Sequence, residues 1–209
     1  MRVTFKYDSM MEQQPLRSGM GGNNNSAKTK LALRAISDGV DFLDRQAIAT
    51  WATKIAVDDK LDLAKDITRL TKAWQAVESE IGPRLAKMFN TDWDPGDVTA
   101  YLTLSGRCPY NPPVRFWIYY ATTSPISLSL HELQHFYAHE LIEPLFKQAG
   151  KAVAFNDFKE SLTVLLNTEF KDIMESADKG YPQHQALRQE IAAQYKAGRS
   201  IEAIAKAHL

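Results

Sequence analysis

Hydrophobic positions recur along this chain with two different periods, which predict a mixture of strands and helices. Alternating apolar and polar residues predict strands at Val3–Tyr7 and Val98–Leu104, and a run of β-branched and aromatic residues predicts a third at Val114–Ala121. Apolar spacings of three and four predict a helix over residues 61–88, kinked or interrupted at Gly82-Pro83. The pattern therefore indicates an α+β fold in which helices dominate.

The remaining apolar patterns predict further helices and one irregular segment. One or two helices are expected within residues 27–56, joined near 37–39. Further helices are expected over 127–145, about 156–176 and 182–196, with a short one from Ser200. Residues 9–26 are rich in Gly, Asn, Gln, Ser and Met and predict a flexible loop. We expect a single domain over residues 1–209, with a helical C-terminal subdomain at about 151–209.

The helix predicted over residues 127–145 has two chemically different sides. Ser124 is a plausible N-cap, Pro125 suits the first helical position, and Pro144 should end or kink the helix. One side carries an apolar stripe of Leu130, Leu133, Tyr137 and Leu141, and the other carries His131, His135 and His139 with Glu132 beside them. One face can thus be buried in a core while the other lines a cleft.

Residues 131–135 read His-Glu-Leu-Gln-His, an H-E-x-x-H pattern. Residues four apart project from one helix face, about 6 Å apart along the axis, so His131 and His135 can bind one Zn²⁺ ion. Glu132 lies next to that face, where it can act as a general base toward a metal-bound water. The alternative interpretation is a surface helix with three incidental histidines.

A catalytic zinc site normally takes a third protein ligand, for which Glu160 is the favoured candidate. It lies 25 residues after His135, near the expected start of the next helix, which can fold back on the first. The alternative is a capping box beginning at Asp157, in which Glu160 bonds only the backbone. His139 is disfavoured because it lies about 12 Å from His131 along a straight helix. Asp157 and Glu143 are the next candidates.

The composition of the chain limits which partners and which cellular location we expect. The 25 basic and 25 acidic residues balance, which gives no electrostatic argument for nucleic acid or an anionic membrane. The single cysteine, Cys108, excludes an intrachain disulfide. No signal-peptide pattern and no run of 18 apolar residues is found, so we expect a cytoplasmic protein that does not bind membranes.

The motif, followed by a helix carrying Glu160, resembles the gluzincin branch of the zincin metallopeptidases over about residues 98–176. The resemblance implies a small mixed or antiparallel sheet packed on the active-site helix, and an edge strand that aligns an extended peptide. Val164 departs from the pattern, since gluzincins often carry an aspartate four residues after the glutamate. Metzincins are a poorer match because Ala138 and Leu141 occupy their glycine and third histidine positions.

The resemblance implies a zinc-dependent peptidase acting on a peptide or protein. Zinc would lie on His131, His135 and Glu160, and Glu132 would move protons between water and the leaving amine. A further donor is needed for the oxyanion. His139, Tyr181 and His184 are candidates for that role or for supporting the ligands, with Tyr119 and Tyr120 as rivals. The alternative is a non-catalytic, zincin-like metal-binding or interaction protein.

Overall fold

The computed structural model describes residues 1–19 and 27–209, which form two compact units. The first, here the sheet unit, comprises 2–75 and 97–123. The second, here the helical unit, comprises Met1, 76–96 and 124–209. The predicted α+β class with a small mixed sheet is confirmed. The expected packing of that sheet on the motif helix and the expected single domain stay predictions.

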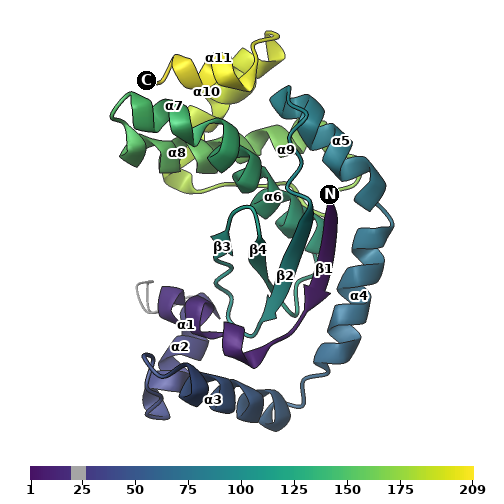
Figure 1. Cartoon of the computed structure of the whole chain (residues 1–209), viewed down its shortest axis with the longest axis vertical. Helices are drawn as coiled ribbons and strands as arrows, with labels where there is room; N and C mark the ends of the chain where they lie inside the picture. Colours follow the sequence, from purple (N-terminus) through teal and green to yellow (C-terminus); the bar gives the residue numbers. More distant parts are fainter. Residues whose placement is uncertain (20–26) are drawn as a thin grey trace. The chain divides into compact units, whose positions relative to one another are not determined.

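The sheet unit is built on four strands in the order β1-β2-β4-β3 (Figure 1). They are β1 (Arg2–Lys6), β2 (Asp97–Thr103), β3 (Tyr110–Asn111) and β4 (Arg115–Tyr119). β1, β2 and β4 are parallel, and short β3 pairs antiparallel with β4. The three predicted strands are confirmed to within two residues at each end, whereas β3 was not predicted.

The helices of the sheet unit supply much of its buried core. They are α1 (Gln13–Gly19), α2 (Ala27–Ser37), α3 (Arg45–Asp58) and α4 (Leu63–Gln75), preceded by the 3-10 helix η1 (Ser9–Met11). Ile48, Ile55 and Leu104 lie in one buried apolar cluster. The predicted loop is wrong for residues 9–19, which are helical apart from a single turn position and bury Leu16 completely. The rest of that prediction, residues 20–26, lies outside the described residues.

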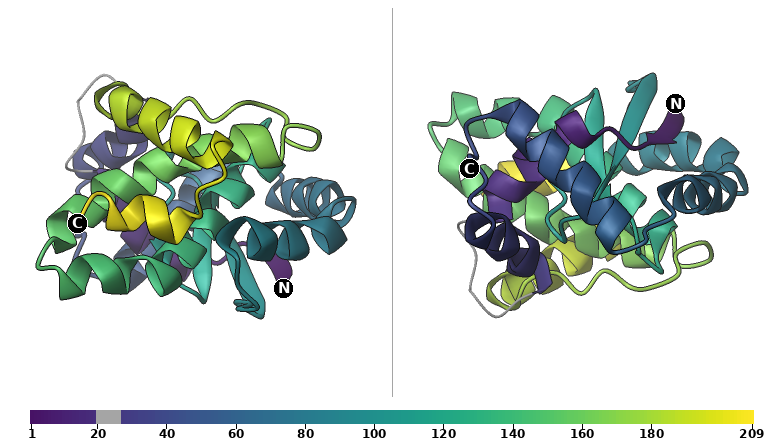
Figure 2. Two further views of the ribbon diagram at one scale, coloured as in Figure 1. Left: turned by 90° about the horizontal axis from the view of Figure 1, so that it is seen from above. Right: turned by 90° about the horizontal axis from the view of Figure 1, so that it is seen from below.

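The helical unit contains the motif helix, α6 (Pro125–Leu141). Its other elements are α5 (Glu78–Phe89), α7 (Glu143–Gln148), α8 (Ala152–Leu162), η2 (Thr163–Leu165), α9 (Leu166–Glu169), η3 (Pro182–His184), α10 (Gln185–Lys196) and α11 (Ile201–Lys206). Figures 1 and 2 agree that α10 lies beside α8, and α8 also packs on α6 and α7. The expected C-terminal subdomain is thus grouped with α5, α6 and α7 in one unit.

Several helix boundaries differ from the predicted ones. The helix expected over 127–145 divides into α6, which ends at Leu141, and α7. The helix expected to run to about residue 176 stops at Glu169, the end of α9. The helix expected over 61–88 breaks at residues 76–77, where the two units divide, and Pro83 lies inside α5. The helix expected from about 156 begins at Ala152, with Lys151 as its N-cap residue, so Asp157 lies inside α8 and not at its start. The earlier start of α8 matters for function, since it places Glu160 in the last turn of its helix and not in the first, as predicted.

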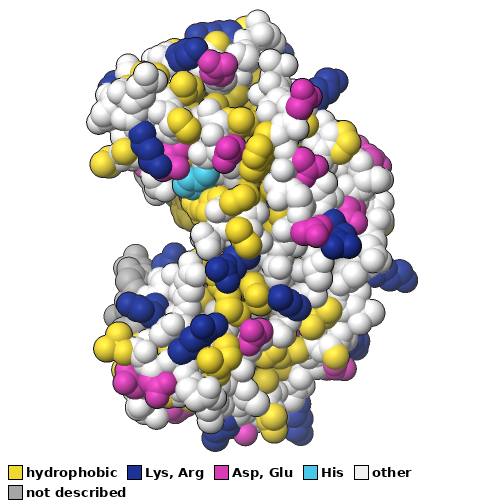
Figure 3. Space-filling view, in the orientation of Figure 1, with side chains coloured by type: hydrophobic (Ala, Val, Ile, Leu, Met, Phe, Trp, Pro, Cys, Tyr) yellow, Lys and Arg dark blue, Asp and Glu magenta, His cyan; other side chains and the backbone are white. Residues whose placement is uncertain are grey.

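The surface carries both signs of charge. On the face in Figure 3, basic and acidic side chains are interspersed over both units, as the equal numbers of the two kinds allow. Within the part of the chain that the structure describes, no helix combines the length and apolar character needed to cross a bilayer.

Candidate metal centre

The N-terminus of α6 is fixed by a residue far along the chain. Pro125 occupies the predicted position at the helix start, and Ser124 is the N-cap residue but makes no side-chain cap bond. Instead, the Glu175 carboxylate accepts hydrogen bonds from the backbone N–H groups of Ile126 (3.0 Å) and Ser127 (2.9 Å) and from the Ser127 hydroxyl. A carboxylate at a helix N-terminus satisfies N–H groups and complements the helix dipole.

His131, His135 and Glu160 come together as the sequence predicted. Each offers one ligand atom, and these atoms all lie within 4.8 Å of one another. Glu160 Oε2 is 4.0 Å from His131 Nε2 and 3.9 Å from His135 Nε2. Ligand atoms on a tetrahedral zinc lie about 3.4 Å apart, so a small side-chain adjustment would close the group around an ion. Two histidines and one carboxylate are also the donor set of open catalytic zinc sites.

The other ring nitrogen of His131 is held by Asp178. Its Nδ1 lies 2.7 Å from Asp178 Oδ2, which leaves Nε2 to face Glu160. A carboxylate on one imidazole nitrogen fixes the ring orientation and tautomer and makes the other nitrogen a better metal ligand. This arrangement is typical of histidines that bind metals.

Asp178 is itself held from several sides. Its Oδ1 accepts a hydrogen bond from Thr163 Oγ1 and pairs with Arg188, both at 2.9 Å. Arg188 also donates to the Asp178 carbonyl at 2.7 Å and to Thr163 Oγ1 at 2.7 Å. Asn167 brackets the same residue, since it donates to the Asp178 carbonyl and accepts from the Asp178 N–H. The irregular segment before η3 is therefore anchored where it meets His131.

Lys159 restricts the Glu160 carboxylate. This lysine is almost completely buried, with 2% of its side chain exposed, and its Nζ lies 2.5 Å from Glu160 Oε1. Oε1 is thus engaged by a cation, while Oε2 faces the two imidazoles. The capping-box interpretation of Glu160 is wrong, because the residue lies in the last turn of α8.

The pKa values of His131 and His135 are shifted in opposite directions. Burial lowers the pKa of His131, but the Asp178 hydrogen bond and nearby carboxylates outweigh it and raise the pKa above its ordinary value. Burial, followed by the positive charges of His131 and Lys159, holds the pKa of His135 well below its ordinary value. Burial raises the pKa of Asp178, yet His131 and Arg188 lower it to about 2. His135 is therefore neutral and Asp178 ionised near neutral pH, as ligand and supporting carboxylate should be.

Glu132 lies on α6 and is buried, with 7% of its surface exposed. Its Oε2 is 3.9 Å from His135 Nδ1. About a fifth of the His131 side chain remains exposed, so the ligand group is not sealed from solvent. The general-base role of Glu132 stays a prediction.

The remaining candidates are not members of the three-residue group. His139 Nδ1 pairs with Glu143 Oε2 at 2.9 Å, and its ring packs on Phe155. His184 is buried in η3, where its ring lies 5.8 Å from that of half-exposed Tyr181. Neither His139 nor Glu143 belongs to the described ligand group, which also omits Asp157. The roles of His139, Tyr181 and His184 near a substrate stay predictions.

Sequence reasoning missed Asp178, Lys159 and Glu175. Asp178 and Glu175 come from the irregular segment after α9, and Glu175 lies where the sequence predicted a helix to about residue 176. Lys159 had one available signal, because it directly precedes the candidate ligand Glu160. A lysine beside a carboxylate in sequence is nevertheless usually a solvated surface residue.

Comparison with known proteins adds no family. A scan against protein-family models found no match, and searches of curated proteins and of solved structures found none either. The resemblance to gluzincins therefore rests on the residues of this chain alone.

Proposed function

We propose that the chain is a zinc-dependent peptidase whose metal is held by His131, His135 and Glu160. The observation that carries the proposal is the convergence of these three groups within 4.8 Å, from two helices separated in sequence. The hydrogen bond from His131 to Asp178 adds support, because it directs the free imidazole nitrogen toward the other two ligands.

In this proposal, side chains of the protein bind the metal, orient its ligands and transfer protons. When bound, the ion would supply Lewis acidity, polarising a carbonyl and lowering the pKa of a water. Glu132 takes the proton of the attacking water and passes it to the leaving amine. Asp178 holds His131, and Lys159 holds Glu160, so that the ligands do not reorganise during turnover.

The test separates metal binding from catalysis. Zinc-loaded protein is incubated with a mixed peptide library, and products are identified by mass spectrometry. Wild type should cleave peptides, lose activity with a chelator and regain it with zinc. Glu132→Gln should keep its zinc and lose about 100-fold or more of the rate, as expected for a general base.

A different outcome would favour the second candidate function. If zinc-loaded wild type binds the metal but cleaves no peptide in the library, the centre is a structural or regulatory site in a non-catalytic metal-binding or interaction protein. The specific observation behind this alternative is the close Lys159–Glu160 pair, since a buried cation on a ligand carboxylate also suits a site that only stabilises the fold.

A further inference from the structure

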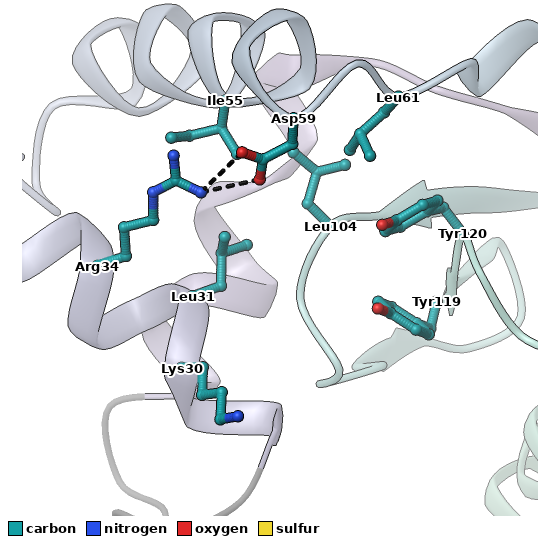
Figure 4. Close-up of a pocket in the computed structure, with 9 residues that line it drawn as sticks. All are labelled: Lys30, Leu31, Arg34, Ile55, Asp59, Leu61, Leu104, Tyr119 and Tyr120. Atoms are coloured by element: carbon teal, nitrogen blue, oxygen red, sulfur yellow. Dashed lines mark hydrogen bonds and ion pairs between the residues drawn. The ribbon is translucent and has the colours of Figure 1, made fainter.

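A pocket in the sheet unit lies outside the metal centre and has a composition of its own. Its volume is about 280 Å³, and it is formed by α2, α3 and the residues that follow β2 and β4 (Figure 4). Leu104 comes directly after β2, and Tyr119 and Tyr120 end and follow β4. β2 and β4 are neighbouring parallel strands, so the pocket lies at their carboxyl ends. In open α/β sheets, the carboxyl ends of parallel strands are a common location for ligand sites.

Hydrogen bonds and one ion pair hold the walls of the pocket. The Leu104 N–H donates to the buried Glu12 carboxylate at 2.8 Å. The Tyr120 carbonyl accepts from Arg69 at 2.8 Å, and the Tyr120 N–H donates to the Thr103 carbonyl. On the opposite side Arg34 of α2 and Asp59 beyond α3 form a two-bond ion pair at 2.8 and 3.1 Å. A pocket with such walls is largely formed before any ligand arrives.

The lining combines an apolar body with a positively charged, hydrogen-bonding rim. Four aliphatic side chains contribute the apolar part: Leu31, Ile55, Leu61 and Leu104. Figure 4 shows both tyrosine rings on the β4 side, with their hydroxyls turned toward α2. Burial and the neighbouring Tyr119 raise the pKa of Tyr120, so its hydroxyl remains a donor at neutral pH. Lys30 and Arg34 outnumber the single acid, Asp59, and leave a net positive charge.

We propose that this pocket binds a small carboxylate with an aromatic or branched aliphatic body. The aliphatic side chains would cover the body of the ligand, and Lys30 with the tyrosine hydroxyls would meet its carboxylate. The volume of about 280 Å³ suits a small ligand, for which we expect an affinity in the millimolar range. The proposal is independent of the metal centre.

The experiment uses methyl NMR of the full chain with three probes of one shape and different charge. These are phenylacetate, neutral phenylacetamide and cationic phenethylamine. Phenylacetate should shift the methyl signals of Leu31, Ile55, Leu61 and Leu104 in the millimolar range, and the two other probes should shift them less. No shift of these methyls with phenylacetate overturns the proposal, and an equal response to phenylacetamide overturns the assigned carboxylate class.

Substitutions in the pocket test whether phenylacetate binds there. Lys30→Gln should weaken phenylacetate binding about 2- to 5-fold, as expected for a partly exposed charge pair. Lys65→Gln, an exposed lysine of α4 in the same unit, is the matched control and should leave binding unchanged. Leu31→Trp fills the pocket and should abolish binding while signals elsewhere in the chain persist. Undiminished binding to Leu31→Trp would place the ligand elsewhere and overturn the proposal.

Discussion

His131 Nδ1 lies 2.7 Å from Asp178 Oδ2, across 47 residues of sequence. This bond joins the motif helix to an irregular segment that Arg188, Thr163 and Asn167 also hold. The metal-binding geometry proposed here therefore depends on residues well beyond the H-E-x-x-H pattern.

Replacing Asp178 should weaken metal binding without removing a ligand. Asp178→Asn removes the charge that orients His131, and loss of such a supporting carboxylate typically costs about 10- to 100-fold in metal affinity. Zinc titration against a competing chelator measures the effect. Glu143→Gln is the matched control, since it alters the carboxylate on His139, outside the ligand group, and should leave affinity unchanged. Equal affinities of Asp178→Asn and wild type would refute the supporting role.

Gly180 is a second position on which the anchored segment depends. Its φ is +59°, and a Cβ built there would lie 2.6 Å from Arg188 Cζ. Gly180→Ala should displace Arg188 from Asp178 and destabilise the fold by about 1–3 kcal/mol, measured by urea unfolding. Gly150→Ala is the comparison, because its φ is +70° but nothing lies within 4 Å of the added Cβ.

The two glycine variants should thus differ. Gly150→Ala should lose only about 1 kcal/mol or less from backbone strain, and its zinc affinity should equal that of wild type. Gly180→Ala should lose more stability and also bind zinc more weakly. Identical losses in both variants would mean that contact with Arg188 adds nothing to the backbone effect.

Glu12 should make stability fall as pH rises. The side chain is fully buried and accepts bonds from Thr103 Oγ1 and the Leu104 N–H. Burial raises its pKa from 4.5 to about 7, against the lowering effect of these bonds. The folded state then holds the proton more tightly than the unfolded state, so this contribution is present below pH 4.5 and lost through pH 7.

The size of that effect follows from the shift. At about 1.4 kcal/mol per pKa unit, the stability lost between pH 4.5 and pH 7 is about 3 kcal/mol. Urea unfolding of wild type and Glu12→Gln across this range measures it, and the difference between the two proteins should change with pH. Parallel curves would show that Glu12 does not titrate there.

The sequence predicted the convergence of His131, His135 and Glu160 better than it predicted their surroundings. His131 and His135 follow from helical spacing, and Glu160 from the need for a third donor after a connection that lets the next helix return. The same reasoning misplaced Glu160 in the first turn, because Asp157 has the composition of a cap that the chain does not use. The contact of Asp178 with His131 could not be predicted, since it depends on how an aperiodic segment packs.

For the fold too, features set by local sequence patterns were predicted, and features set by tertiary packing were not. Strands β1, β2 and β4 follow from local patterns of alternation and β-branched residues. Residues 9–19 appeared polar enough to be a loop, yet α1 forms there because Leu16 is buried in the core of the sheet unit. The break at residues 76–77 marks the division between two units, which no local pattern encodes.

The central claim is that His131, His135 and Glu160 form one metal site, and bound zinc per chain tests it most directly. Wild type, His135→Ala, Glu160→Gln and the control His139→Ala are loaded with zinc, desalted and measured by atomic spectrometry. We expect about one zinc in wild type and His139→Ala, and loss of the metal in the two ligand variants. Loaded wild type without stoichiometric zinc, or Glu160→Gln with undiminished zinc, would contradict the three-residue centre.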